Sequence, residues 1–88
     1  MRTNHRILAS RVRAIRLEQF GADGVAIVAL FMGIPVRTWD HYESGVAMPG
    51  YVLLKFIELT GAAPHWLFEG EGERYIARPE RSDLRATQ

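Results

Sequence analysis

The segment from Gly33 to Gly45, G-I-P-V-R-T-W-D-H-Y-E-S-G, constrains the fold most strongly, because turn residues bracket an amphipathic helical pattern. Val36, Trp39 and Tyr42 recur every three residues and can hold a helix to a core, while the polar residues between them face the other way. Pro35 suits a first helical turn, where its missing amide proton is not needed. The final glycine can adopt the left-handed conformation that closes a helix. The segment therefore predicts a short helix that is fixed on one side and presented on the other.

The residues just before this segment, Val25 to Met32, form an uninterrupted apolar run that stops at Gly33. A surface helix normally carries one polar face, so a helix that is apolar all round is either buried on every side or covered by a partner. Periodicity alone also fits a buried strand. Because the sequence offers no other good strand candidate, we interpret the run as a helix.

An earlier helix is predicted from His5 to Gln19, with Thr3 or Asn4 available to cap its first turn. Its apolar side carries Leu8, Val12 and Ile15. Its other sides carry Arg6, Arg13 and Arg16. We expect these arginines to be solvated or, near the N-terminal end, to approach phosphate.

Two helices are predicted after the presented one. The first spans Tyr51 to Thr60, and Gly61 is positioned to end it. We expect its inward-facing residues to be Leu53, Leu54 and Ile57, with Phe56 as a fourth candidate. The second begins at Pro64, a favoured first position, and runs to Phe68.

Composition and charge limit the class of protein. With 88 residues, 48% of them hydrophobic and 24% charged, the chain has the make-up of one globular domain. It contains no cysteine, so disulfides and thiolate metal sites are excluded. Arginines interrupt the N-terminal region, so no secretion signal is expected, and the longest apolar run is far shorter than the roughly 20 residues that span a membrane. We expect a soluble cytoplasmic protein that does not enter a membrane.

The sequence offers little for catalysis. The three histidines are scattered, and His65 with Glu69 supplies only two ligands, too few for a metal site. Asp40 and His41 are neighbours on a helix and point about 100° apart, so they do not form a catalytic pair. We therefore expect no enzyme activity, no metal and no cofactor. The positive charge is concentrated at the N-terminus, where residues 1–20 hold five arginines and one glutamate, a distribution that can serve contact with phosphate.

The order of these parts resembles the lambda-repressor-like helix-turn-helix family, also called Cro/C1-type or XRE-type, over roughly residues 8–72. The most specific motifs are T-W-D-H-Y-E-S-G, followed by a proline, and P-H-W-L-F-E-G-E-G. The resemblance implies an all-α, compact five-helix domain over residues 1–72. It leaves residues 73–88 as a polar extension, which we expect to be loosely held beyond about residue 78.

In that family the second and third helices form the helix-turn-helix, and the third enters the DNA major groove. The resemblance therefore implies a sequence-specific transcriptional regulator that binds double-stranded DNA as a homodimer and reads it with the helix from Pro35 to Ser44. Glu43 takes a structural role near the end of that helix. The residues assigned to DNA are Val36, Arg37, Asp40 and His41 in the groove, and Thr38 and Ser44 at phosphates. Arg37 is the strongest reader, because a guanidinium can pair in bidentate fashion with guanine.

Two departures from the family pattern keep a second function open. Gly24 and Val25 stand where relatives usually carry a polar pair that holds a phosphate, and residues 46–49 carry no charge. The presented helix therefore has fewer phosphate contacts beside it, which matters because phosphate contacts dominate affinity for DNA. Relatives commonly carry charged residues at Ile27, Leu30 and Phe31, so we expect an exposed apolar patch there, unless the N-terminal residues or the tail fold over it. Such a patch, or the C-terminal region, would serve a homodimer. The alternative function is a protein-interaction module, antitoxin-like or self-associating, with weak or no DNA binding.

Overall fold

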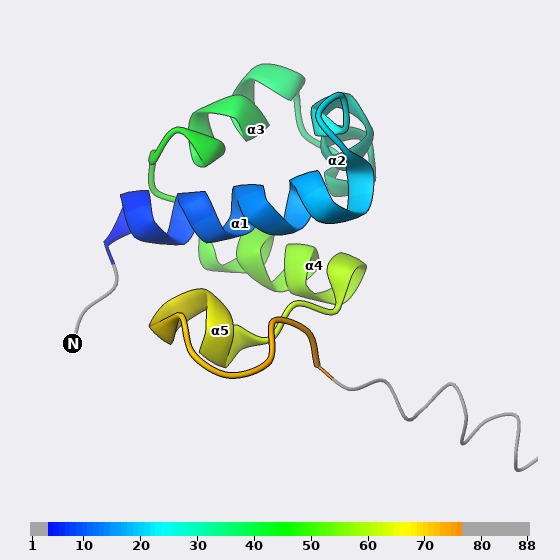
Figure 1. The fold of residues 1–88 in the computed structure, drawn as a ribbon. Helices are drawn as coiled ribbons and strands as arrows, with labels where there is room; N and C mark the ends of the chain where they lie inside the picture. Colours follow the sequence, from blue (N-terminus) through cyan, green and yellow to red (C-terminus); the bar gives the residue numbers. More distant parts are fainter. Residues whose placement is uncertain (1–3, 77–88) are drawn as a thin grey trace, which may run out of the picture.

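The structure, a computed structural model, describes residues 4–76 of the chain. In this range it consists of five helices (Figure 1), namely α1 (His5–Phe20), α2 (Val25–Met32), α3 (Val36–Glu43), α4 (Gly50–Thr60) and α5 (Pro64–Glu69). The described residues include no β-strand, only an isolated antiparallel bridge between Ala62 and Tyr75. The predicted all-α class is therefore confirmed for this part of the chain, and the apolar run before Gly33 is a helix. No helix within residues 4–76 has both the length and the apolar character needed to cross a membrane.

The helix ends are set by capping residues, as the sequence predicted. Asn4 caps α1 by accepting a hydrogen bond from the Ile7 amide at 2.8 Å, and Gly33 closes α2 in the left-handed conformation at φ 72°. Pro35 is the residue before α3 rather than part of its first turn, and Ser44 is its C-cap. The presented helix is thus one residue shorter at each end than predicted.

Helix α1 crosses the middle of the molecule, with α2 and α3 on one side of it and α4 and α5 on the other (Figure 1). Every helix contributes to one core. Its largest fully buried side chains are Trp39, Phe56, Ile15, Leu67, Val12 and Val28. The Trp39 ring lies 5.4 Å from that of Phe56 and 6.2 Å, edge-on, from that of Tyr42. The prediction that Trp39 is a core residue of the presented helix is confirmed.

Three predictions of burial are wrong. Leu54 is 65% exposed, because the buried arc of α4 is centred on Val52 and Phe56, one turn apart, and Leu54 lies across the helix from it. Val36 is 45% exposed, so the anchoring of α3 begins one turn later, at Trp39. Arg16, expected on a wet side of α1, is buried.

Polar side chains of α1 bind α3, α4, α5 and the segment after α5. Arg16 binds the end of α3, as described below, and Gln19 donates to the Thr60 carbonyl at the end of α4 at 2.8 Å. Arg11 donates to the Leu67 carbonyl in α5 at 2.9 Å. Glu18 accepts hydrogen bonds from the Tyr75 hydroxyl at 2.6 Å and from the guanidinium of Arg74 at 2.9 Å. Helix α1 is therefore the element on which the later segments are assembled.

The first residues of the predicted polar extension pack on the domain. The Ala63 amide donates to the Arg74 carbonyl at 2.9 Å, and the Ile76 amide donates to the Gly61 carbonyl at 2.8 Å. The Arg74 guanidinium also lies 4.6 Å from the centre of the Trp66 ring, at cation–π distance. The chain thus stays attached as far as the described residues go. The expectation for the tail beyond residue 78 falls outside them, and the domain boundary at residue 72 stays a prediction.

Candidate nucleic-acid interface

Helices α2 and α3 are joined by the three residues Gly33, Ile34 and Pro35, as predicted. The Gly33 amide donates to the Leu30 carbonyl and the Ile34 amide to the Ala29 carbonyl, both at 3.1 Å, so the chain turns sharply at the end of α2. Only glycine adopts a positive φ at such a position without strain. The Trp39 amide in turn donates to the Pro35 carbonyl at 3.2 Å, which starts α3 directly after the turn.

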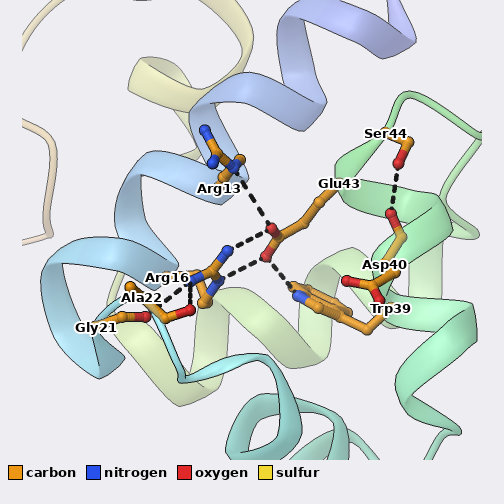
Figure 2. Close-up of polar contacts among 8 residues, drawn as sticks. All are labelled: Arg13, Arg16, Gly21, Ala22, Trp39, Asp40, Glu43 and Ser44. Atoms are coloured by element: carbon orange, nitrogen blue, oxygen red, sulfur yellow. Dashed lines mark hydrogen bonds and ion pairs between the residues drawn. The ribbon is translucent and has the colours of Figure 1, made fainter.

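A buried ion pair fixes α3 to α1. The Glu43 carboxylate accepts two hydrogen bonds from the Arg16 guanidinium, at 2.9 and 2.8 Å, and a third from the Trp39 indole at 2.6 Å (Figure 2). Arg13 adds a weaker ion pair at 4.0 Å. The hydrogen bonds to Glu43 raise the pKa of Arg16 above its ordinary value. Glu43 therefore has the structural role that the resemblance implied, and Arg16 is its partner.

The same guanidinium also holds the connection between α1 and α2. It donates to the carbonyl of Gly21 at 2.7 Å and to that of Ala22 at 3.3 Å (Figure 2). Arg16 thus ties the end of α1, the link to α2 and the end of α3 to one point. Because bidentate charged hydrogen bonds are strong and directional, this arrangement fixes the orientation of α3 on the domain.

The exposed side of α3 carries most of the residues assigned to DNA. Successive residues of a helix are about 100° apart, so five of the six assigned residues fall within an arc of about 140°. We call this arc the α3 outer face, and it consists of Val36, Arg37, Asp40, His41 and Ser44. All five are exposed. Thr38, the sixth assigned residue, is half-buried on the flank of the helix.

The groups on the α3 outer face differ in their availability. No carboxylate in the described part of the chain lies within ion-pair distance of Arg37, so its guanidinium is open to a ligand. The Ser44 hydroxyl donates to the Asp40 carbonyl at 2.8 Å (Figure 2), which occupies its proton but leaves its oxygen able to accept. Arg37 is therefore the best-placed cation of the assigned set, and Asp40 sets a negative charge one turn from it.

Two further arginines lie beside α3 that the sequence did not assign to the site. A side chain added at Gly45, just after α3, would meet the Arg6 side chain at 3.2 Å, so the start of α1 lies against the end of α3. Arg13 lies two turns along α1 from Arg6, beside Glu43, and more than half of its side chain is exposed. The seven-residue spacing that puts both on one face of α1 was the available signal, but only the contact between the helices shows that this face borders α3.

The first residues of α2 offer no polar side chain to a phosphate. A side chain at Gly24 would overlap the Phe20 side chain and carbonyl, so this position requires glycine. No side chain caps α2. The close approach of α1 to α2 is thus a physical reason why a polar residue does not stand here.

The outward side of α2 is apolar and open. Leu30 is 79% exposed, the highest value among the large hydrophobic residues of the described range, and Ile27 and Phe31 are about half exposed, while Val28 and Met32 face the core. The expectation of an exposed patch is therefore confirmed for the described residues. The segments considered as covers for it, residues 1–3 and the tail, lie outside the range that the structure describes.

Comparison of the sequence with known proteins identified no relative. No protein-family model matches the sequence, and no curated protein matches it either. Membership of the lambda-repressor-like family therefore stays a prediction from the motifs. Within residues 4–76, no three histidine or carboxylate side chains are grouped as metal ligands would be.

Proposed function

We propose that the protein is a DNA-binding transcriptional regulator of the cytoplasm that places the α3 outer face in the major groove of double-stranded DNA. The observation that carries the proposal is the combination of an exposed helix face with a buried ion pair that fixes the helix to α1. A reading helix must present its side chains in one orientation, because hydrogen bonds to base edges tolerate little displacement. The Arg16–Glu43 pair supplies that orientation.

The chemistry of the face supports sequence readout. Arg37 in the first turn of α3 is suited to bidentate pairing with guanine, and Val36 beside it is suited to the thymine methyl group. The first turn is the part of a recognition helix that contacts base edges in helix-turn-helix proteins. His41 can donate to a base or a phosphate, and Asp40 can accept from cytosine.

Affinity must come from a small number of phosphate contacts. Arg6 and Arg13 flank α3 on the α1 side, and Thr38 and Ser44 add hydroxyl groups, whereas α2 adds none. Since each neutralised phosphate contributes about −0.9 to the slope of log K against log salt, two arginines give a shallow slope of roughly −2 per copy. We propose that two copies bind a two-fold operator with half-sites about one helical turn apart, which doubles these contacts.

Selection of duplexes from a random pool, followed by fluorescence anisotropy across a salt series, tests the proposal. We expect an enriched sequence with two-fold symmetry and a preference at one base pair per half-site that is lost in Arg37→Ala. The matched control is Arg74→Gln, which removes one positive charge from a position packed against α5. If no sequence is enriched and no duplex binds at low salt, the proposal fails. Equal weakening by both variants on all sequences would make Arg37 a general electrostatic contact.

A second candidate function follows from the open apolar side of α2. Large exposed apolar residues grouped on one helix are typical of protein-binding surfaces. We propose as the alternative that the fold serves as a protein-interaction module, antitoxin-like or self-associating, with weak or no DNA binding. This alternative predicts that Leu30→Glu abolishes the activity of the protein and that Arg37→Ala preserves it.

A further inference from the structure

The apolar side of α2 has the geometry of a helix-pairing surface. Four exposed residues lie on it within an arc of about 140°, since residues four apart in a helix are about 40° apart and neighbours are about 100° apart. We call them the α2 outer face, and they are Ala26, Ile27, Leu30 and Phe31. No residue of α2 carries a charge. A helix that packs on this face therefore meets no charge that it would have to bury without a partner.

Opposite charges stand at the two ends of the same helix. Asp23 is exposed two residues before α2 begins. At the other end, the Lys55 ammonium donates to the Met32 carbonyl at 3.4 Å, so a cation from α4 is held beside the last residue of α2. With a rise of 1.5 Å per residue, an eight-residue helix separates these charges by about 12 Å.

We propose that the partner of the α2 outer face is a second copy of this chain, with the two α2 helices packed antiparallel about a two-fold axis. In that orientation Asp23 of each copy meets the Lys55 end of α2 in the other, so both ends of the interface pair opposite charges. The two helix dipoles are also opposed. A parallel pairing would bring like charges together at each end. A two-fold interface is built from one surface used twice, and a surface with opposite charges at its two ends is self-complementary in this way.

The size of the face sets the strength of the pairing. The largest apolar patch on a typical monomer is about 300–600 Å², whereas a stable complex buries about 800 Å² on each partner. Four side chains on two helical turns fall short of the second value. The structure therefore points to a weak dimer, one that forms at high concentration or where another ligand holds two copies together. The inference develops the self-associating form of the second candidate function and rests on it, but does not require DNA binding.

Sedimentation equilibrium of the full chain without DNA, from about 10 μM to 1 mM, measures the pairing. We expect a reversible monomer–dimer equilibrium and at least a tenfold higher dissociation constant for Leu30→Glu. The matched control is Leu54→Glu, an equally drastic change at an exposed leucine that belongs to α4 and not to the α2 outer face. We expect it to leave the dissociation constant unchanged. Circular dichroism melting shows whether each variant is folded. A wild-type chain that stays monomeric at 1 mM, or equal effects of the two glutamates, would overturn the pairing.

A charge exchange tests the antiparallel orientation with variants whose core is intact. Asp23→Lys and Lys55→Glu should each weaken the dimer severalfold, and the double variant should regain most of the wild-type affinity, because the exchanged charges again meet opposite partners. A double variant that is no better than the weaker single variant would refute the antiparallel arrangement. Because these measurements contain no DNA, their failure overturns the pairing and leaves DNA binding to its own test.

Discussion

Removal of the negative charge from Glu43 should lower the free energy of unfolding substantially and loosen α3. In Glu43→Gln the side chain keeps its shape and can still accept from the Trp39 indole, but the Arg16 guanidinium is left without a counter-charge. Only 5% of the Arg16 side chain and 7% of the Glu43 side chain are exposed, so water cannot replace the lost partner. Loss of one member of a buried ion pair typically costs about 3–5 kcal/mol.

This loss is large against the stability of the whole domain, which for a chain of this size is about 5–10 kcal/mol. Two carbonyl groups, of Gly21 and Ala22, still accept from Arg16, so we place the expected loss near the lower end of the range, about 3 kcal/mol. Equilibrium unfolding in urea, followed by tryptophan fluorescence and by far-UV circular dichroism, measures it. The free energy of unfolding should fall with little change in the urea dependence, since the same surface is exposed on unfolding.

A double variant separates the charge from the shape. In Arg16→Met with Glu43→Gln no charge is buried, the Trp39 indole retains an acceptor, and most of the lost stability should return, because a buried ion pair contributes little beyond the cost of its own desolvation. If Glu43→Gln alone costs less than about 1 kcal/mol, the pair is not isolated from water as described, and the reasoning that α3 is fixed through it is refuted.

Three further predictions concern single contacts. Glu18→Gln should remove a pH-dependent contribution to stability. The hydrogen bonds from the Tyr75 hydroxyl and from Arg74 lower the pKa of Glu18 below its ordinary 4.5. In urea unfolding, the free energy of unfolding of the wild type should therefore exceed that of the variant above this pH, and the difference should shrink as the pH falls through the lowered pKa. Gly24→Ala should cost about 1–3 kcal/mol through overlap with Phe20, whereas Gly50→Ala, at a position with open space around it, should be neutral or slightly stabilising; similar melting temperatures for the two would contradict the overlap. Asn4→Ala should lower stability by about 1 kcal/mol, because it removes the cap of α1, and a melting temperature equal to the wild type would show that the cap contributes nothing.

The local signals in the sequence were sufficient to place the helices. Glycine and proline bracket each short helix, and the apolar run before Gly33 became α2 with the predicted bounds, Val25–Met32. Asn4, one of two candidates, is the cap of α1. These features depend on residues within one or two turns of each other, which is why they can be read without a structure.

The interior could not be predicted in the same way. Arg16 appeared solvated because its partner, Glu43, lies 27 residues further along the chain, and no periodic pattern connects the two. Leu54 and Leu53 are adjacent leucines, so hydrophobicity alone could not distinguish the buried one. In the candidate site, the exposed position of Arg37 could be predicted from the sequence. The position of Arg6 beside α3 could not, because it depends on how α1 and α3 pack together. Whether the α3 outer face reads DNA stays a prediction.

The contacts of α1 also bear on the order in which the chain acquires its structure. The partners of Arg16, Gln19, Arg11 and Glu18 lie 27, 41, 56 and 57 residues ahead of them. During synthesis from the N-terminus, α1 emerges first, yet its polar side chains find their acceptors and donors only when residues 43 to 75 have followed. A nascent chain that ends within α4 contains Glu43, the partner of Arg16, but lacks the partners of Gln19, Arg11 and Glu18. The final docking of the domain waits for the segment around Tyr75.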